Sequence, residues 1–138
     1  MLLTALWWGG MTSLSFVAVP MLFAQLGNPA LAGPVAAKLF QLQSWFSVVA
    51  SLVLLLWVRH LRHLPGQATS AMALLPALLL AALAALLQEY GVAHQIITAR
   101  AMGGHLRLWH SVGTVLVLLQ WLCALRVLWL LACERKIP

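Results

Sequence analysis

A polar segment set between two apolar runs decides the fold of this chain. The segment is Gln88–His110, with the sequence QEYGVAHQIITARAMGGHLRLWH. The run before it, Ala71–Leu87, reads AMALLPALLLAALAALL, and the run after it extends to Cys133 with a single charged residue. Two apolar runs of this length, separated by polar residues, are typical of two membrane-spanning helices and their connection. We therefore expect any chemistry of the protein to be located in this segment, which we call the hinge.

The composition places the whole chain in a bilayer. Of 138 residues, 64% are hydrophobic and only 7% are charged, whereas a soluble domain carries about 25% charged residues. A transmembrane helix needs about 20 mostly apolar residues, and four segments meet this requirement. We predict an all-α protein, an integral membrane four-helix bundle with short loops. It forms a single transmembrane domain over residues 1–138, with spans at about 2–26, 35–57, 71–90 and 108–131.

The net charge of +6 is interpreted as a signal of topology and not of nucleic-acid binding. The basic residues stand singly or in small groups near the ends of apolar runs, where they flank a membrane. The expected partner is therefore the lipid bilayer, with no nucleic acid. With four spans, one side carries Arg59, Arg62, Arg126, Arg135 and Lys136, and the other carries Lys38, Arg100 and Arg107. The excess predicts that both termini are cytoplasmic.

Two spans carry faces suited to helix packing. In the first, Ala5, Gly9 and Ser13 recur every four residues, which places three small side chains on one helical face. In the second, polar residues fall within about a third of the helix circumference and are expected to turn inward, away from lipid. They are Gln41, Ser44, Ser47 and Ser51. These patterns predict packing against other helices, with a solute path as the less favoured alternative.

The hinge offers candidate metal ligands. His94, His105 and His110 lie near one loop, with Met102 and Glu89 close in sequence, and imidazole with thioether could hold copper, or two histidines haem b. On one helix His105 and His110 would point about 140° apart, so His94 with His110 is the better pair. The alternative is that the histidines only bond to water or carbonyls at the membrane surface, with no cofactor bound.

Glu89 has two interpretations. As a residue near the interface it is a solvated or arginine-paired carboxylate, and as an intramembrane acid it would carry a proton. The chain contains no nucleophile–base motif, phosphate loop or pair of carboxylates. We therefore expect a non-enzymatic membrane protein, an accessory or structural subunit that packs against a larger membrane complex or against itself.

The first span also carries a family resemblance. The segments that carry this resemblance are Leu6–Gly10 (LWWGG), Pro20–Phe23 (PMLF), Leu31–Gly33 (LAG), Leu39–Phe40, Arg100–Met102 and Trp109–Ser111. In these segments the chain resembles a bacterial family of uncharacterised four-helix membrane proteins related to eukaryotic transmembrane protein 205. The chain is also distantly similar to the membrane domain of copper-resistance D proteins. Val112-Gly113 departs from the first pattern, where a serine is expected. The resemblance implies four helices and adds some weight to copper, but implies no activity.

Overall fold

The computed structural model describes residues 1–63 and 68–134, and the regular elements in these ranges are all helices. Four of the continuous helical stretches are long and apolar enough to cross a membrane: Leu2–Leu26, Pro29–Leu61, Ala71–Ala99 and Leu106–Cys133. This confirms the predicted all-α membrane fold with four spans. The elements are α1 (Leu2–Ser13), η1 (Leu14–Ala18), α2 (Val19–Leu26), α3 (Pro29–Leu61), α4 (Ala68–Leu86), η2 (Leu87–Ala93), α5 (His94–Met102) and α6 (Leu106–Glu134).

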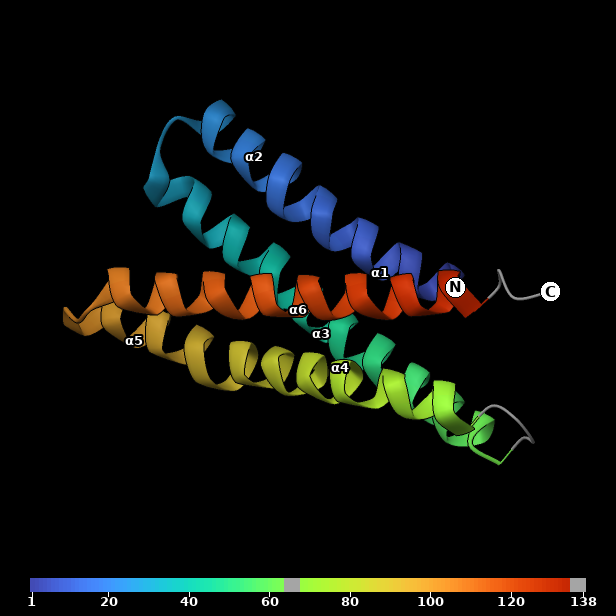
Figure 1. Cartoon of the computed structure of the whole chain (residues 1–138). Helices are drawn as coiled ribbons and strands as arrows, with labels where there is room; N and C mark the ends of the chain where they lie inside the picture. The colour runs from blue at the N-terminus through green and yellow to red at the C-terminus, as the bar shows by residue number, and fades with distance from the viewer. Residues whose placement is uncertain (64–67, 135–138) are drawn as a thin grey trace.

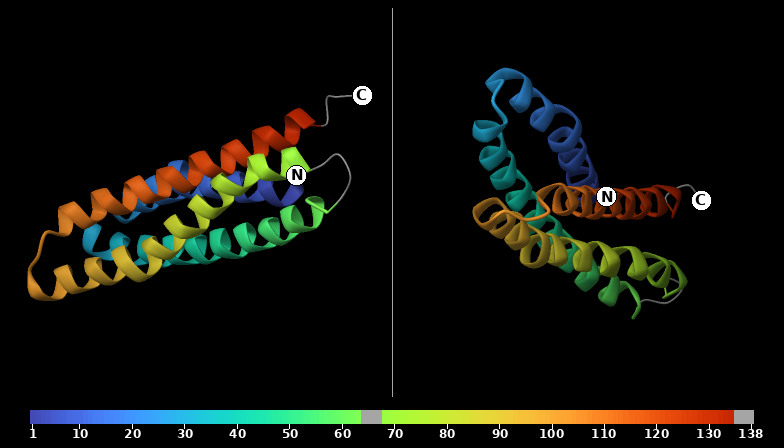
Figure 2. Two further views of the ribbon diagram at one scale, coloured as in Figure 1. Left: turned by 60° about the horizontal axis from the view of Figure 1, so that its bottom comes forward. Right: turned by 90° about the vertical axis from the view of Figure 1, so that its left-hand side faces the viewer.

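The helices do not contribute equally to the bundle. The most extensive packing joins α3 to α4 and α4 to α6, while the first span contacts α6 mainly through α1 and contacts α3 through both α1 and α2. Helix α2 has no buried residue, and Figure 1 shows it running away from α6. The right-hand view of Figure 2 shows the same separation from another side. The first span is therefore held firmly at its N-terminal half only.

Helix α4 forms the centre because its buried face consists largely of alanine. Small side chains let neighbouring helices approach closely, which is how helices associate where lipid removes the hydrophobic driving force. The leucines on the opposite side of α4, Leu79, Leu80 and Leu83, are exposed and face lipid. The buried positions are Ala71, Leu74, Ala77, Leu78, Ala81, Ala84 and Ala85.

The connection between the first two spans is shorter than expected. Gly27 adopts the left-handed conformation with φ of 60°, which ends α2. The side chain of Asn28 then accepts a hydrogen bond from the Ala30 backbone N–H at 2.9 Å, and Pro29 occupies the first helical position. The second helix therefore begins at Pro29 and not near residue 35. Pro34 lies inside this helix.

A π-helical turn precedes Pro20 in the first span. Proline has no backbone N–H and its ring collides with the carbonyl four residues earlier. Here the five residues of η1 widen the helix, and the Val19 N–H bonds to the Leu14 carbonyl five residues back. The proline is thereby accommodated by a wider turn.

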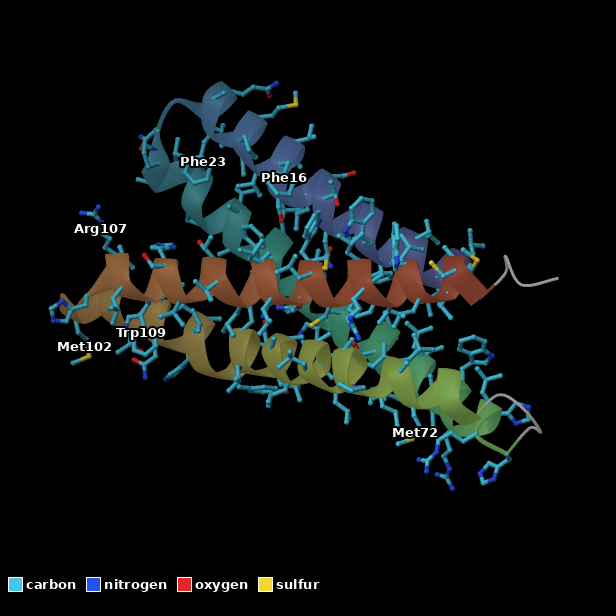
Figure 3. All side chains as sticks on the ribbon, in the orientation of Figure 1. Phe16, Phe23, Met72, Met102, Arg107 and Trp109 are labelled. Carbon is cyan, nitrogen blue, oxygen red and sulfur yellow. The ribbon has the colours of Figure 1, made fainter. Side chains whose placement is uncertain are left out.

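The hinge is mostly helical. The third span continues beyond the predicted end near residue 90, through the π-helical segment η2 and α5 to Met102. Gly103, with φ of 71°, ends α5, and three residues connect it to α6. Met102, Arg107 and Trp109 lie at this end of the molecule, and Met72 lies at the other (Figure 3).

Candidate functional site

The polar face of α3 lies inside the bundle. Ser44, Ser47 and Ser51 are buried, and Gln41 is half-buried. The four residues follow one another at intervals of three or four, so they form a polar line along the helix. Because a polar group facing lipid carries a large energetic penalty, this face is directed at the other helices.

Gln41 joins this line to the hinge. Its Nε2 donates a hydrogen bond to Glu89 Oε1 at 2.7 Å, and its Oε1 accepts one from Lys38 Nζ at 3.3 Å. A single amide therefore links an ammonium to a carboxylate. The bond connects α3 to η2 and brings together residues 48 positions apart, and it is the main polar contact between the second and third spans.

The depth of Glu89 follows from the basic residues of α3. Lys38 and Arg59 are 21 residues apart, about 31 Å along a helix, which matches a hydrocarbon core of about 30 Å. Lys38 therefore marks one membrane surface, and Glu89 lies near that level through Gln41. Trp45 and Tyr90 meet edge to face here, with centroids 6.3 Å apart, as aromatic residues do at membrane surfaces.

Gln88 attaches the same segment to α6. A Cβ atom built on Gly113 would lie 3.4 Å from Gln88 Nε2 and 3.4 Å from Val92 Cγ1, so glycine at position 113 allows the amide to approach closely. Gln88 Oε1 is buried and has no hydrogen-bond partner within the described residues. A serine was expected near this position, and the chain has Gly113 instead. The absence of a side chain at Gly113 leaves room for Gln88 and Val92 of η2.

The hinge histidines lie on the surface. His94, His105 and His110 are all exposed. Over residues 1–63 and 68–134, no group of three or more His, Cys, Asp or Glu side chains is placed to hold a metal ion. The two cysteines are free thiols, with Cys123 buried and Cys133 exposed. The pairing of His94 with His110 for copper or haem b stays a prediction.

Two tryptophan contacts hold α1 and were not predicted. Trp7 is fully buried, and its Nε1–H donates to Ser47 Oγ at 3.0 Å. Trp121 Nε1 of α6 donates to Thr12 Oγ1 at 2.9 Å, and the Trp121 ring lies 5.5 Å from that of Trp8. The available signal was the pair Trp7-Trp8 within an apolar helix, because a buried indole N–H usually finds an acceptor. Trp7 has one, whereas the Nε1 of Trp8 is buried without a partner among the described residues.

The small-residue face of α1 points outward. Ala5 and Ser13 are exposed, Gly9 is half-buried, and nothing lies within 4 Å of a Cβ atom built on Gly9. The residues that α1 buries are Thr4, Trp7 and Met11. The predicted packing face is thus not used within this chain.

Comparison with protein-family models matches residues 2–105 to the domain of unknown function DUF4149. The chain belongs to this family. The DUF4149 match spans the first three membrane helices and ends immediately before α6. No curated protein and no solved structure matches the chain. The likeness to transmembrane protein 205 and to copper-resistance D domains therefore rests on the sequence motifs alone.

Proposed function

We propose that this DUF4149 protein is a non-enzymatic membrane subunit that assembles with other transmembrane helices through the outer face of α1. The observation that supports the proposal is the outward direction of Ala5, Gly9 and Ser13. In lipid, small residues repeated every four positions let a second helix approach closely. The open space beside Gly9 is available for such a helix.

The surroundings of this face suit a partner helix. A groove of about 490 Å³ lies beside it, lined by Gly10, Ser13 and Ala18 of the first span and by Leu42 and Phe46 of α3, among others. The first-span wall consists of small residues and Leu14, and the α3 wall consists of larger apolar side chains and Gln43. A helix laid against Gly9 could place its side chains in this groove, so packing and shape complementarity would favour the same orientation.

The partner is a second copy of the chain or a subunit of a larger membrane complex. A self-complementary face of small residues suits a symmetric pair of identical helices. The alternative function, copper or haem handling, has less support, because the hinge histidines are exposed and the described residues contain no group of three or more His, Cys, Asp or Glu side chains placed for a metal ion. We further propose that the protein resides in a bacterial inner membrane with both termini in the cytoplasm.

Native mass spectrometry in mild detergent, on protein extracted from its own membrane, tests the proposal. The wild-type protein is expected to retain a dimer or a larger assembly, and the partner mass distinguishes self-association from a foreign subunit. The double substitution Gly9→Leu with Ser13→Leu should reduce the assembled fraction at least tenfold, because two large side chains hold the helices apart. Helical content should be unchanged, since the space around Gly9 is empty.

The control is Ala73→Leu, which places a leucine at an exposed small residue of α4. This variant should assemble like the wild type. A monomeric wild-type protein, or an assembly that persists in the Gly9 and Ser13 variant, would overturn the proposal. The same spectra also report any copper-sized or haem-sized mass increment, which would reinstate the alternative.

A further inference from the structure

Two hydroxyl groups, one on α1 and one on α3, are buried without a partner. Thr4 and Ser51 are both 0% exposed, and neither Thr4 Oγ1 nor Ser51 Oγ has a hydrogen-bond partner among the described residues. A hydroxyl withdrawn from water and left unbonded is unfavourable. Within a membrane, no bulk solvent can reach it.

The register of the two helices places these groups at one level. The bond from Trp7 to Ser47 fixes the pairing of α1 with α3, and the two helices run in opposite directions on either side of the Gly27 turn (Figure 1). Thr4 lies three residues before Trp7, and Ser51 lies four residues after Ser47. Because the helices are antiparallel, Thr4 and Ser51 are shifted in the same direction from the Trp7–Ser47 contact, by about 4.5 and 6 Å along the helix axes. The two residues therefore lie at the same level of the helix pair.

Other hydroxyls in the chain avoid this situation by bonding to their own helix. Thr12, Thr98, Ser111 and Thr114 each donate to the carbonyl four residues earlier. Thr4 makes no such bond within the described residues. Ser51 could use the Ser47 carbonyl but does not. Both hydroxyls are therefore free for a common partner.

Ser47 adds a third polar group between them. Its Oγ accepts hydrogen bonds from Trp7 Nε1 at 3.0 Å and from Gln43 Nε2 at 3.3 Å. A serine hydroxyl has two lone pairs and one proton, so its own proton is left to donate. Three hydroxyls with unused capacity thus lie on adjacent turns of a sealed seam.

We propose that Thr4, Ser47 and Ser51 bind at least one internal water molecule between α1 and α3. A buried water makes two to four hydrogen bonds to otherwise unsatisfied groups, and these three hydroxyls supply that number. The water joins α1 to α3 at the one end where the first span is anchored. It also accounts for hydroxyls at positions that alanine or valine could fill.

Matched substitutions distinguish a water site from two hydroxyls that are simply unsatisfied. Thr4→Val and Ser51→Ala, singly and together, are compared with the wild type by thermal unfolding in mild detergent. If water bridges the hydroxyls, each single variant unfolds at a temperature several degrees lower than the wild type. The decrease in the double variant is then smaller than the sum of the two single decreases, because both substitutions remove the same water site. If the hydroxyls are unsatisfied, removing them leaves the unfolding temperature unchanged or raises it, which would overturn the proposal.

The controls are Thr114→Val and Ser111→Ala, which remove exposed hydroxyls bonded within α6. Neither should shift the unfolding temperature by more than about one degree.

A second measurement detects the water directly. Radiolytic hydroxyl-radical footprinting oxidises side chains next to bound water even when they are buried. Trp7, which is 0% exposed, should be oxidised in the wild-type protein and several-fold less in the double variant. Met11, buried one turn further along, serves as the internal reference. Absence of Trp7 oxidation in the wild type would overturn the proposal even if the variants fail to fold.

Discussion

Gln41 is the residue on which the polar end of the bundle depends. Its amide donates one hydrogen bond to Glu89 and accepts one from Lys38. The Glu89 carboxylate and the Lys38 ammonium are therefore linked through this amide. This arrangement favours the structural interpretation of Glu89, because the carboxylate already has a donor and lies at the depth of a membrane-surface lysine. Hydrogen bonds to charged groups are stronger than those between neutral groups.

A double-mutant cycle measures this bond. Gln41→Leu and Glu89→Leu, alone and combined, are expected to show a coupling of about 0.6 to 1.7 kcal/mol, the range found for polar pairs in membrane helices. Unfolding in mixed micelles provides the free energies. The control cycle pairs Gln41→Leu with Gln95→Leu, since Gln95 is exposed on α5, and should give no coupling. Equal values in the two cycles would contradict the assignment.

At the scale of single elements, both π-helical segments have an identifiable setting. Segment η1 accommodates Pro20, whereas η2 contains Gln88, Glu89 and Tyr90, the polar start of the hinge. A wider turn adds a residue and so rotates the following side chains around the helix axis. In η2, where the turn is widened in this way, Glu89 contacts α3 and Gln88 contacts α6.

Replacing Pro20 with alanine should remove the first of these turns. The restored N–H at position 20 can bond to the Phe16 carbonyl, so η1 is expected to become regular α-helix. Solution NMR in micelles would show the change as hydrogen-exchange protection at residue 20 and altered shifts over residues 14–18. Pro76→Ala is the comparison, because α4 is regular around Pro76 and only local shifts should follow. A persistent π turn in the Pro20 variant would show that another feature produces it.

On the scale of the whole molecule, topology can be read from the two ends. Met1 and the last turn of α6 lie at the end where α3 finishes and α4 begins, and the Gly27 turn lies at the other (Figure 1). Arg59 and Arg62 mark the first end, and Lys38 and Arg107 stand towards the second. The predicted orientation places the first end in the cytoplasm.

Cysteine labelling tests this orientation with the native thiol. Cys133 is exposed and Cys123 is buried, so a membrane-impermeant maleimide should modify only Cys133. Labelling is expected in inverted vesicles and absent in intact spheroplasts. Asn28→Cys, made with Cys133→Ala, should give the reverse result because position 28 is exposed in the opposite turn. Labelling of Cys133 from outside would invert the topology.

The number of spans and the fold class were determined by the sequence alone. Length and hydropathy set where a chain can cross a bilayer, because each backbone polar group in lipid must be bonded within its own helix. The same local rules predicted the inward polar face of α3. The predicted start of α3 was too late in the sequence. Asn28 caps the helix and Pro29 occupies its first position, but Gly33-Pro34, a few residues later, also resembles a helix start.

The pairing of helix faces was decided by tertiary structure. Periodicity assigns residues to a face but does not say which helix meets it, and the decisive contacts join residues 40 and 48 positions apart. Only packing could show that Trp7 meets Ser47 and that Glu89 meets Gln41. For the same reason, the small-residue face of α1 remained on the outside: the bulky face with Trp7 and Met11 filled the seam, which left Ala5, Gly9 and Ser13 facing the membrane.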